Sequence, residues 1–509
     1  MPNHAGCETG KRMNKRDWAL VAAMTLIYLI MALINLGSFE APQTGWEPEH
    51  LYESFVVDFG REVEIDKIML FGGLGHAWGC FGSLQIKAWD GTDFVPYTFV
   101  DMKSIFRWHY STDKVKTSKL LIINEYLRSD DEDDRNRYFR AEYRELAFFS
   151  GSELIKDFTI TDVNSEKDVS LLFDEQELVP DRPSYLNGTY FDEIYFPRTA
   201  LEQIEQRSIL YENTHPPLGK TLLSVGIRIF GMNPFGWRIM GTLFGVFMLP
   251  LMYIWSKRLF KDSFWAFFCT WLLMFDFMHF AQTRLATIDS YTCFFVMATY
   301  WCMLEYYDSR AYEKGFFRSL VPLLFSGIFL GLGGATKWVG LYGAFGLAVL
   351  FFMSRIFEYM DYNRWLDKAV EQNQISSNDR PKLRRSYILK YWMGTCLFCV
   401  LFFIIIPAAI YTLSFIPIQN HNDDRNLVVE VIDSVKSMYN YHKGVVEPHP
   451  YSSHWYEWPL MLRPIYYYAG QLLPEGLGSS IAAFGNPMVW WTGFIAFWVL
   501  LWLVVSRRF

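Results

Sequence analysis

The sequence has few charged residues and few cysteines. Only 20% of the 509 residues are charged, and the seven cysteines are scattered along the chain. Five of them lie inside apolar runs, where a thiol usually packs as a small hydrophobic group: Cys269, Cys293, Cys302, Cys396 and Cys399. This distribution argues against a disulfide framework.

The chain also lacks the short motifs of several enzyme and cofactor-binding classes. It contains no HExxH and no Walker or dinucleotide-binding glycine pattern, and its one CxxC, Cys396–Cys399, lies in an apolar run without a second pair. We therefore expect no metal and no bound cofactor. The 47 basic and 54 acidic residues give 47 − 54 = −7 at pH 7, which argues against a nucleic-acid-binding protein.

The sequence does have long runs of apolar residues. Hydrophobic residues make up 51% of the chain and aromatic residues 18%, and long stretches almost without charge alternate with charged ones. Eight runs approach the roughly twenty residues that cross a hydrocarbon core of about 30 Å. They are 18–36, 237–256, 263–280, 286–305, 319–335, 338–354, 387–412 and 488–506. The pattern predicts a multi-pass α-helical membrane protein with large aqueous parts.

The distribution of Lys and Arg predicts its orientation. Basic residues gather in 1–17, 257–262, 306–318, 355–386 and after 506, whereas the short connections between them on the other side hold almost only Arg284 and Lys337. We expect the protein to lie in the cell membrane. Because cytoplasmic loops are enriched in Lys and Arg, we expect its N-terminus in the cytoplasm and extracytoplasmic loops at 37–236 and 413–487. The first span lacks a small-residue cleavage site, so we interpret it as a retained anchor.

These patterns divide the chain into six segments. We expect a cytoplasmic N-terminus with the first span, a β domain, a catalytic outer loop with an interfacial helix, spans two to seven, a second outer loop, and a last span with a cytoplasmic end. Their bounds are 1–36, 40–152, 185–236, 237–412, 413–487 and 488–509.

The β domain is predicted from short runs of β-branched and aromatic residues separated by Gly- and Asp-containing turns: SFVVDFG, EIDKIMLFGG, SLQIKAWDG, KLLIINEY and ELAFFS. Their order resembles the discoidin-type, galactose-binding-like β-sandwich, which implies possible carbohydrate binding. Trp78, Trp108 and His109 would then stack on sugar faces or belong to the core. The acidic run 130–134 suits calcium or, as we favour, a solvated loop.

Charged residues near the predicted outer ends of the spans indicate a reactive site. Arg238, Arg284 and Lys337 are three cations in positions where lipid makes charge costly, and together they suit a phosphate. Asp192 and Glu193 form an adjacent carboxylate pair in the first outer loop, where one of them would act as a general base. Snorkelling at helix ends and ordinary solvated charge are the alternatives.

Further polar groups accompany this pair. His215 immediately precedes two prolines at a predicted helix start, and Asp289 lies at the beginning of the fourth span. The second outer loop adds His454, Trp458 and Arg463. Mixed aromatic and polar groups are typical of sugar and polyprenyl sites, although interfacial aromatic anchoring also explains some of them.

Seven segments in a fixed order resemble the protein O-mannosyltransferases, the dolichyl- or polyprenyl-phosphate-mannose–protein mannosyltransferase family of the GT-C membrane fold. They are DEIYFPR, HPPLGK, WRIMG, RLATIDS, TKWVGLY, HWYEWPLMLRP and GNPMVWW. The resemblance covers most of the chain outside the β insert. The insert, and the absence of the β-trefoil domain of eukaryotic members, point to a bacterial branch. The family usually continues through further spans, whereas this chain stops at Phe509, as a shortened or truncated form would.

The resemblance implies a reaction. Mannose would pass with inversion and without a metal from polyprenyl-phosphate-mannose to Ser or Thr hydroxyls of an acceptor protein. Asp192 and Glu193 would be catalytic, with Asp192 as the base, while Arg238, Arg284 and Lys337, with Arg463, would hold the donor phosphate. Two alternatives stay open. One is a GT-C transferase that modifies a lipid or cell-wall polymer, and the other is a sugar sensor or transporter.

Overall fold

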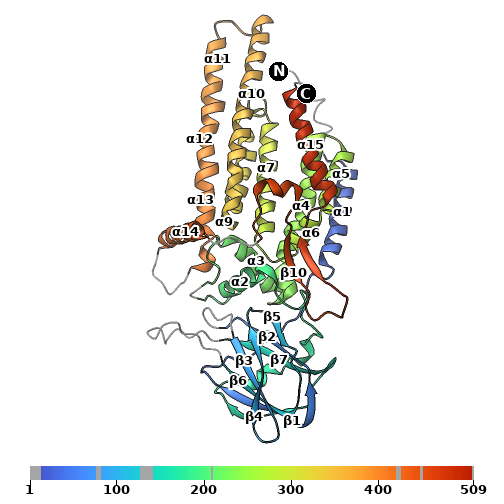
Figure 1. Ribbon diagram of the computed structural model, residues 1–509. Helices are drawn as coiled ribbons and strands as arrows, with labels where there is room; N and C mark the ends of the chain where they lie inside the picture. The colour runs from blue at the N-terminus through green and yellow to red at the C-terminus, as the bar shows by residue number, and fades with distance from the viewer. Residues whose placement is uncertain are drawn as a thin grey trace.

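The computed structural model describes residues 13–75, 82–125, 141–207, 210–419, 426–446 and 451–506. A β domain lies at one end of a long helical bundle (Figure 1). Helix α1 (Lys15–Leu33) begins and α15 (Pro487–Val505) ends at the opposite end of the bundle (Figure 1).

The β domain is a sandwich of two antiparallel sheets. One has the order β4-β3-β6-β1-β9 and the other β5-β2-β7-β8, and alternating side chains of both sheets share one buried core. The strands are β1 (Ser54–Ile65), β2 (Lys67–Gly72), β3 (Gly82–Trp89), β4 (Phe94–Met102), β5 (Arg107–Ser111), β6 (Val115–Asn124), β7 (Tyr143–Ser150), β8 (Glu153–Leu154) and β9 (Thr159–Asn164). The five runs predicted as strands form β1, β2, β3, β6 and β7.

The sandwich extends beyond the predicted boundary at residue 152. Strand β9 pairs with the edge of β1, Asp58 opposite Thr159, and Val169 and Leu172 complete the core. The sequence pattern missed β9 because its side chains are mostly exposed and polar, as suits the edge of a sheet.

Two residues predicted as sugar-stacking groups are not available for that role. Trp108 is 1% exposed and belongs to the core that joins the sandwich to the helices. The His109 ring is hydrogen-bonded to the carbonyl of Ser104 at 2.9 Å, and burial lowers the pKa of His109 to about 4. Both are structural, so for these two residues the core alternative holds and sugar stacking does not. Trp78 and the acidic run 130–134 lie outside the described residues.

Six helical segments in the described part of the chain are long and apolar enough to cross a membrane. They are α1, α4 (Pro234–Phe260), α9 (Phe316–Thr336), the segment Trp338–Glu371 that contains α10 (Gly343–Glu371), the segment Arg380–Ile418 that contains α11 (Arg380–Tyr387), α12 (Gly394–Val400) and α13 (Ile406–Leu413), and α15. The chain is therefore a multi-pass helical membrane protein.

The predicted third and fourth spans differ from the prediction. The third is two helices, α5 (Ser263–Met274) and α6 (Phe277–Thr283), bent by 59°. The bend arises where the Asp276 side chain caps α6 by accepting hydrogen bonds from the backbone N–H groups of Met278 and His279. The fourth forms α7 (Asp289–Tyr307), which is not among the segments apolar enough to span. By length and apolar composition, six segments of the described residues qualify as spans, or seven with the bent pair, while α7 runs in the bundle beside α4 and α9.

Shorter elements lie between the bundle and the sandwich (Figure 1). They are α2 (Phe196–Ile204), α3 (Leu218–Phe230), α14 (Leu427–Gly444) and the hairpin of β10 (Ile465–Ala469) with β11 (Ser480–Ala483), while α8 (Ala311–Lys314) is a single turn before α9. Side chains of the β5-β2-β7-β8 sheet, such as Phe71, share one core with Leu223 of α3 and Trp237 of α4. The sandwich is therefore packed directly on the elements that carry the predicted site.

Candidate active site

The adjacent carboxylates lie on a 3₁₀ turn, Phe191–Ile194, whose first residue has an unusual backbone conformation. Phe191 has a φ of 50°, in the left-handed region that a bulky side chain adopts only under constraint, at a cost of about 1–3 kcal/mol. The two acidic side chains that follow have different surroundings. Glu193 is completely buried, whereas Asp192 is partly exposed.

Glu193 is held by the guanidinium of Arg238. Arg238 donates from Nε to Oε1 and from Nη2 to Oε2 of Glu193, both at 2.7 Å, and the backbone N–H of Ala286 donates to Oε1 at 3.0 Å. Such a two-point pair between planar groups is strong and directional. Burial of both partners makes Glu193 a fixed, charge-balanced group.

Arg238 uses all five of its N–H donors inside the protein. Besides the two bonds to Glu193, it donates to the carbonyls of Leu36, Tyr185 and Gly188 at 2.7–2.9 Å. A guanidinium has five N–H groups, so no donor is left for a phosphate. The geometry contradicts the predicted role of Arg238 as a phosphate ligand and assigns it to the support of the carboxylate turn.

Asp192 is in the opposite situation. Its carboxylate makes no hydrogen bond among the described residues, and burial together with the negative charge of Asp289 raises its pKa. The positive charges of Lys337 and His215 lower the pKa in part. A carboxylate with free oxygens and a raised pKa has the properties of a general base.

Lys337 and Asp289 form an ion pair beside Asp192. The Nζ of Lys337 donates to Oδ1 of Asp289 at 2.7 Å, and the two side chains are 29% and 40% exposed. Asp289 begins α7 and Lys337 ends α9. Two helix termini thus bring to one place residues that are 48 positions apart in the sequence, and the ammonium keeps further N–H groups for an anion.

His215 is positioned by Glu212. Its Nδ1 lies 2.9 Å from Oε1 of Glu212, whose Oε2 accepts a hydrogen bond from the buried Lys220 at 2.5 Å. The charges of Lys220 and His215 and these hydrogen bonds overcome the effect of burial and hold the pKa of Glu212 far below its usual range. The ring of His442, on α14, lies 5.6 Å from that of His215.

Arg284 lies beside Tyr190, two residues before Asp192. Its Nη2 donates to the last carbonyls of α1 and the following turn, those of Ile34 and Asn35, and its guanidinium lies over Phe280. It lines a cavity of about 410 Å³ with Tyr185, Tyr190 and Ser480, among others. Its Nε is buried without a hydrogen-bond partner in the described part of the chain. Arg284 and Arg238 thus both lie beside Tyr190, whereas Lys337 pairs with Asp289 next to Asp192.

The predicted residues of the second outer loop are also apart from Asp192. His454, Trp458 and Arg463 are exposed. Trp458 donates to the hydroxyl of Ser453, and Arg463 donates to the carbonyl of Ser452. Of the four predicted phosphate ligands, the structure places only Lys337 beside Asp192.

Sequence reasoning missed one neighbour of Asp192. Tyr467 of β10 is 7% exposed, its hydroxyl donates to the amide oxygen of Gln282, and the charges of Asp289 and Asp192 act on it. The run of three tyrosines at 466–468 was the available signal, but nothing in it distinguishes the two buried tyrosines, Tyr467 and Tyr468, from the exposed Tyr466.

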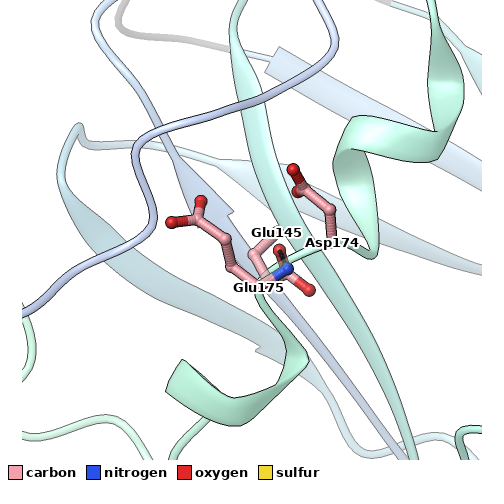
Figure 2. Close-up of side chains that lie close together, drawn as sticks. All are labelled: Glu145, Asp174 and Glu175. Atoms are coloured by element: carbon pink, nitrogen blue, oxygen red, sulfur yellow. Dashed lines mark hydrogen bonds between the residues drawn. The ribbon is translucent and has the colours of Figure 1, made fainter.

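One group of carboxylates in the described residues is close enough to bind a cation, and it lies in the sandwich (Figure 2). Glu145 is buried, and burial beside Asp174 and Glu175 raises the pKa of Glu145 to about 8. Glu175 already accepts hydrogen bonds from the backbone N–H groups of Gln43 and Thr44. A protonated Glu145 is a poor ligand at neutral pH, so we assign no metal to this group.

The fold and the site define a multi-pass membrane protein whose Asp192 carboxylate has a raised pKa and no hydrogen bond among the described residues. Residues 182–421 match the family model of dolichyl-phosphate-mannose-protein mannosyltransferases. Residues 427–509 match the C-terminal four-transmembrane region of protein O-mannosyltransferases. The chain belongs to the protein O-mannosyltransferase family.

Individual relatives are distant. The polyprenol-phosphate-mannose–protein mannosyltransferase of Mycobacterium tuberculosis (strain ATCC 25618 / H37Rv) is 28% identical over 341 residues, which cover 58% of this chain and 60% of that protein. The enzyme of the same name from Corynebacterium glutamicum is 25% identical over 340 residues, 58% of this chain and 61% of that protein. The chain thus spans about 60% of the length of these curated relatives.

Among solved structures, the S. cerevisiae protein O-mannosyltransferase Pmt1-Pmt2 complex bound to the sugar donor matches with 18% identity and a TM-score of 0.33. The match covers 45% of this chain and 30% of that chain.

Proposed function

We propose that this protein transfers mannose from a polyprenyl-phosphate-mannose donor to Ser or Thr hydroxyls of proteins, within the GT-C fold that its family membership suggests. The relatives' names supply the donor class and the acceptor class. The donor is a co-substrate, and the reaction needs no resident cofactor.

One observation carries the proposal: the two adjacent carboxylates are chemically different. Glu193 is buried and neutralised by Arg238, whereas Asp192 is free of hydrogen bonds among the described residues and has a raised pKa beside Lys337 and His215. A carboxylate with free oxygens and a raised pKa beside cations is typical of a general base. Asp192 is therefore the base, and Glu193 fixes the turn that carries it.

The proposed step needs no further reactant. The acceptor hydroxyl oxygen attacks C1 of mannose while the bond from C1 to the phosphate oxygen breaks, and that oxygen leaves with the electron pair. Asp192 takes the hydroxyl proton, and attack from the face opposite the phosphate inverts C1. Lys337 and His215 stabilise the charge that develops on the departing phosphate.

We also propose that the site lies on the extracytoplasmic side. The basic clusters at 257–262, 306–318 and 355–386 lie away from the sandwich, toward the end of the bundle where α1 begins and α15 ends (Figure 1). Under the positive-inside rule that end is cytoplasmic. The carboxylate turn, the sandwich and α14 then face outward, where an acceptor protein and the head group of the lipid donor meet.

The main competing function is transfer of the same sugar to a lipid or cell-wall polymer, because nothing in the described residues specifies the acceptor. The charged residues of the site gather at one end of the bundle and not at mid-membrane, where transporter sites lie, which disfavours a transporter. Carbohydrate binding by the sandwich stays a prediction without a site, because Trp108 and His109 are used in packing.

Transfer from labelled polyprenyl-phosphate-mannose to membrane acceptors tests the proposal. Membranes that contain the parent protein should label protein, Asp192→Asn should lose the labelling, and Asp181→Asn, on an exposed part of the same loop, should keep it. Label only in lipid or polymer would favour the competing acceptor class. Equal labelling by Asp192→Asn would refute the role of the base.

A further inference from the structure

The hairpin of β10 and β11 covers the carboxylate turn, although the two are more than 270 residues apart in the sequence. Tyr467, Tyr468 and Ala483 of the hairpin share a buried cluster with Tyr190 and Leu285. The Tyr468 ring contacts those of Tyr185 and Tyr190, with centroids 5.7 and 5.8 Å apart. The second outer loop is therefore part of the wall of the site.

Tyr467 touches the first residue of the turn. Its ring centroid lies 4.6 Å from that of Phe191. The ring is fixed in turn by its hydroxyl, which donates to Gln282, while Gln282 donates from Nε2 to the Thr287 hydroxyl at 3.1 Å. A chain of contacts thus runs from the α6–α7 connection through Tyr467 to Phe191.

Phe191 needs such a support. A non-glycine residue persists in the left-handed region only where its surroundings over-determine the conformation. The Phe191 side chain is 38% exposed, so surrounding core does not enclose it, and the Tyr467 ring is the aromatic contact that the structure gives it. The conformation of Phe191 decides where the next side chain, Asp192, points.

We propose that Tyr467 is a positioning residue of the transfer reaction: its ring holds Phe191 in the left-handed conformation and so directs the Asp192 carboxylate into the site. This inference rests on the proposed function, in which Asp192 is the base. The hydroxyl of Tyr467 acts only through Gln282, and the ring does the positioning.

The test compares Tyr467→Ala, which removes the ring, with Tyr467→Phe, which removes only the hydroxyl. Tyr467→Ala should lower kcat roughly tenfold or more, and Tyr467→Phe should retain most of it. Tyr466→Ala is the matched control, because Tyr466 is the neighbouring tyrosine of β10 and is 50% exposed. It should behave like the parent.

A pH profile separates positioning from general damage. Three charged groups act on the pKa of Asp192: Asp289, Lys337 and His215. The charges of Asp192 and Asp289 in turn act on Tyr467. Loss of the ring admits water to Asp192, so its pKa falls and the acidic limb of kcat/KM should move to lower pH. Tyr466→Ala should leave the limb in place.

Phe191→Gly provides a second test, because glycine adopts the left-handed conformation without strain. In the Phe191→Gly background the Tyr467→Ala change should cost several-fold less than in the parent, so the two effects should be non-additive. Full additivity, or an acidic limb unmoved in Tyr467→Ala, would overturn the inference.

A measurement that needs no transfer activity keeps the inference separate from the proposed function. Carbodiimide-driven amine labelling of Asp192, read by peptide mass spectrometry, should become several-fold faster in Tyr467→Ala and stay unchanged in Tyr466→Ala. If the parent protein transfers no mannose but Asp192 is labelled faster in Tyr467→Ala, the positioning role of Tyr467 holds and the proposed function is rejected. Unchanged labelling would reject the positioning whatever the activity.

Discussion

At the scale of single residues, Asp192 and Glu193 should respond differently to neutralisation. Glu193→Gln leaves the Arg238 guanidinium buried without its counter-charge, and breaking a buried pair in this way costs about 3–5 kcal/mol. Asp192→Asn removes a carboxylate without hydrogen-bond partners among the described residues and relieves its repulsion with Asp289. We expect a large loss of thermal stability in detergent for Glu193→Gln and almost none for Asp192→Asn. Equal losses would contradict the division of roles.

Glu145 makes a second residue-scale prediction, for pH. Its folded-state pKa of about 8 lies above its ordinary value of 4.5, so the folded protein keeps a proton that the unfolded chain releases. The stability contribution is complete below pH 4.5 and is lost as the pH rises toward 8, at about 1.4 kcal/mol per unit. Glu145→Gln should therefore show a smaller fall in Tm between pH 5 and 8 than the parent. Glu177→Gln, at an exposed position nearby, is the control, and a parallel fall in all three would contradict the prediction.

The sequence predicted residue types at the site better than their roles. Asp192, Lys337, His215 and Asp289 were all identified, and the structure brings them together. The role of Arg238 was not predictable, because its partners come from the end of α1, the loop at 185–188 and the carboxylate turn. The spacing of residues along the sequence does not show which distant segments will accept hydrogen bonds from the five N–H groups of Arg238.

At the scale of elements, the site depends on the ends of two helices. Lys337 ends α9 and Asp289 begins α7, so the pair is rigidly placed, whereas Arg284 donates to carbonyls that follow α1 and lines the cavity beside Tyr190. We expect Lys337→Ala to raise KM for the lipid donor roughly tenfold, as loss of a charge-assisted contact of about 1.4 kcal/mol does. Arg463→Ala, an exposed cation outside the site, should leave KM unchanged. The donor KM should be measured for Lys337→Ala, Arg463→Ala and Arg284→Ala. A larger rise in KM for Arg284→Ala than for Lys337→Ala would contradict this assignment.

The sandwich takes part in the same placement. The Thr189 hydroxyl donates to the carbonyl of Ile105 at 2.7 Å, and its backbone N–H donates to that of Phe106 at 2.9 Å. A Cβ added to Gly188 would lie only 3.1 Å from the Cα of Arg107, so the two segments fit closely. Thr189→Val keeps the shape and removes one buried hydrogen bond, worth about 1 kcal/mol. We expect kcat to fall several-fold at unchanged donor KM, because the sandwich turn positions the carboxylates without touching the donor. A rise in donor KM alone would contradict this role.

Elements were predictable where one face is regularly buried. Strands β1, β2, β3, β6 and β7 carry the alternating or continuous apolar runs that the sequence displayed. Strand β4 contains Pro96 and several exposed residues, and β9 is an edge strand, so their stability comes from pairing rather than from burial. Helix α7, predicted as the fourth span, is less apolar than the six segments that qualify by composition. Many of its residues are buried against α4 and α9, so it needs fewer apolar side chains than a helix that faces lipid.

At the scale of the whole molecule, the remaining prediction concerns orientation. The sandwich and the start of α1 lie at opposite ends of the bundle (Figure 1), so the proposed topology places the exposed β3–β4 turn outside the cell and the exposed α10–α11 connection inside. A cysteine introduced as Thr92→Cys should react with a membrane-impermeant maleimide in intact cells. Ser376→Cys should react only after the membrane is permeabilised, and the unsubstituted chain reports the background from native thiols. The reverse pattern would place Asp192 on the cytoplasmic side, where the proposed outer-face reaction has no access to its acceptor.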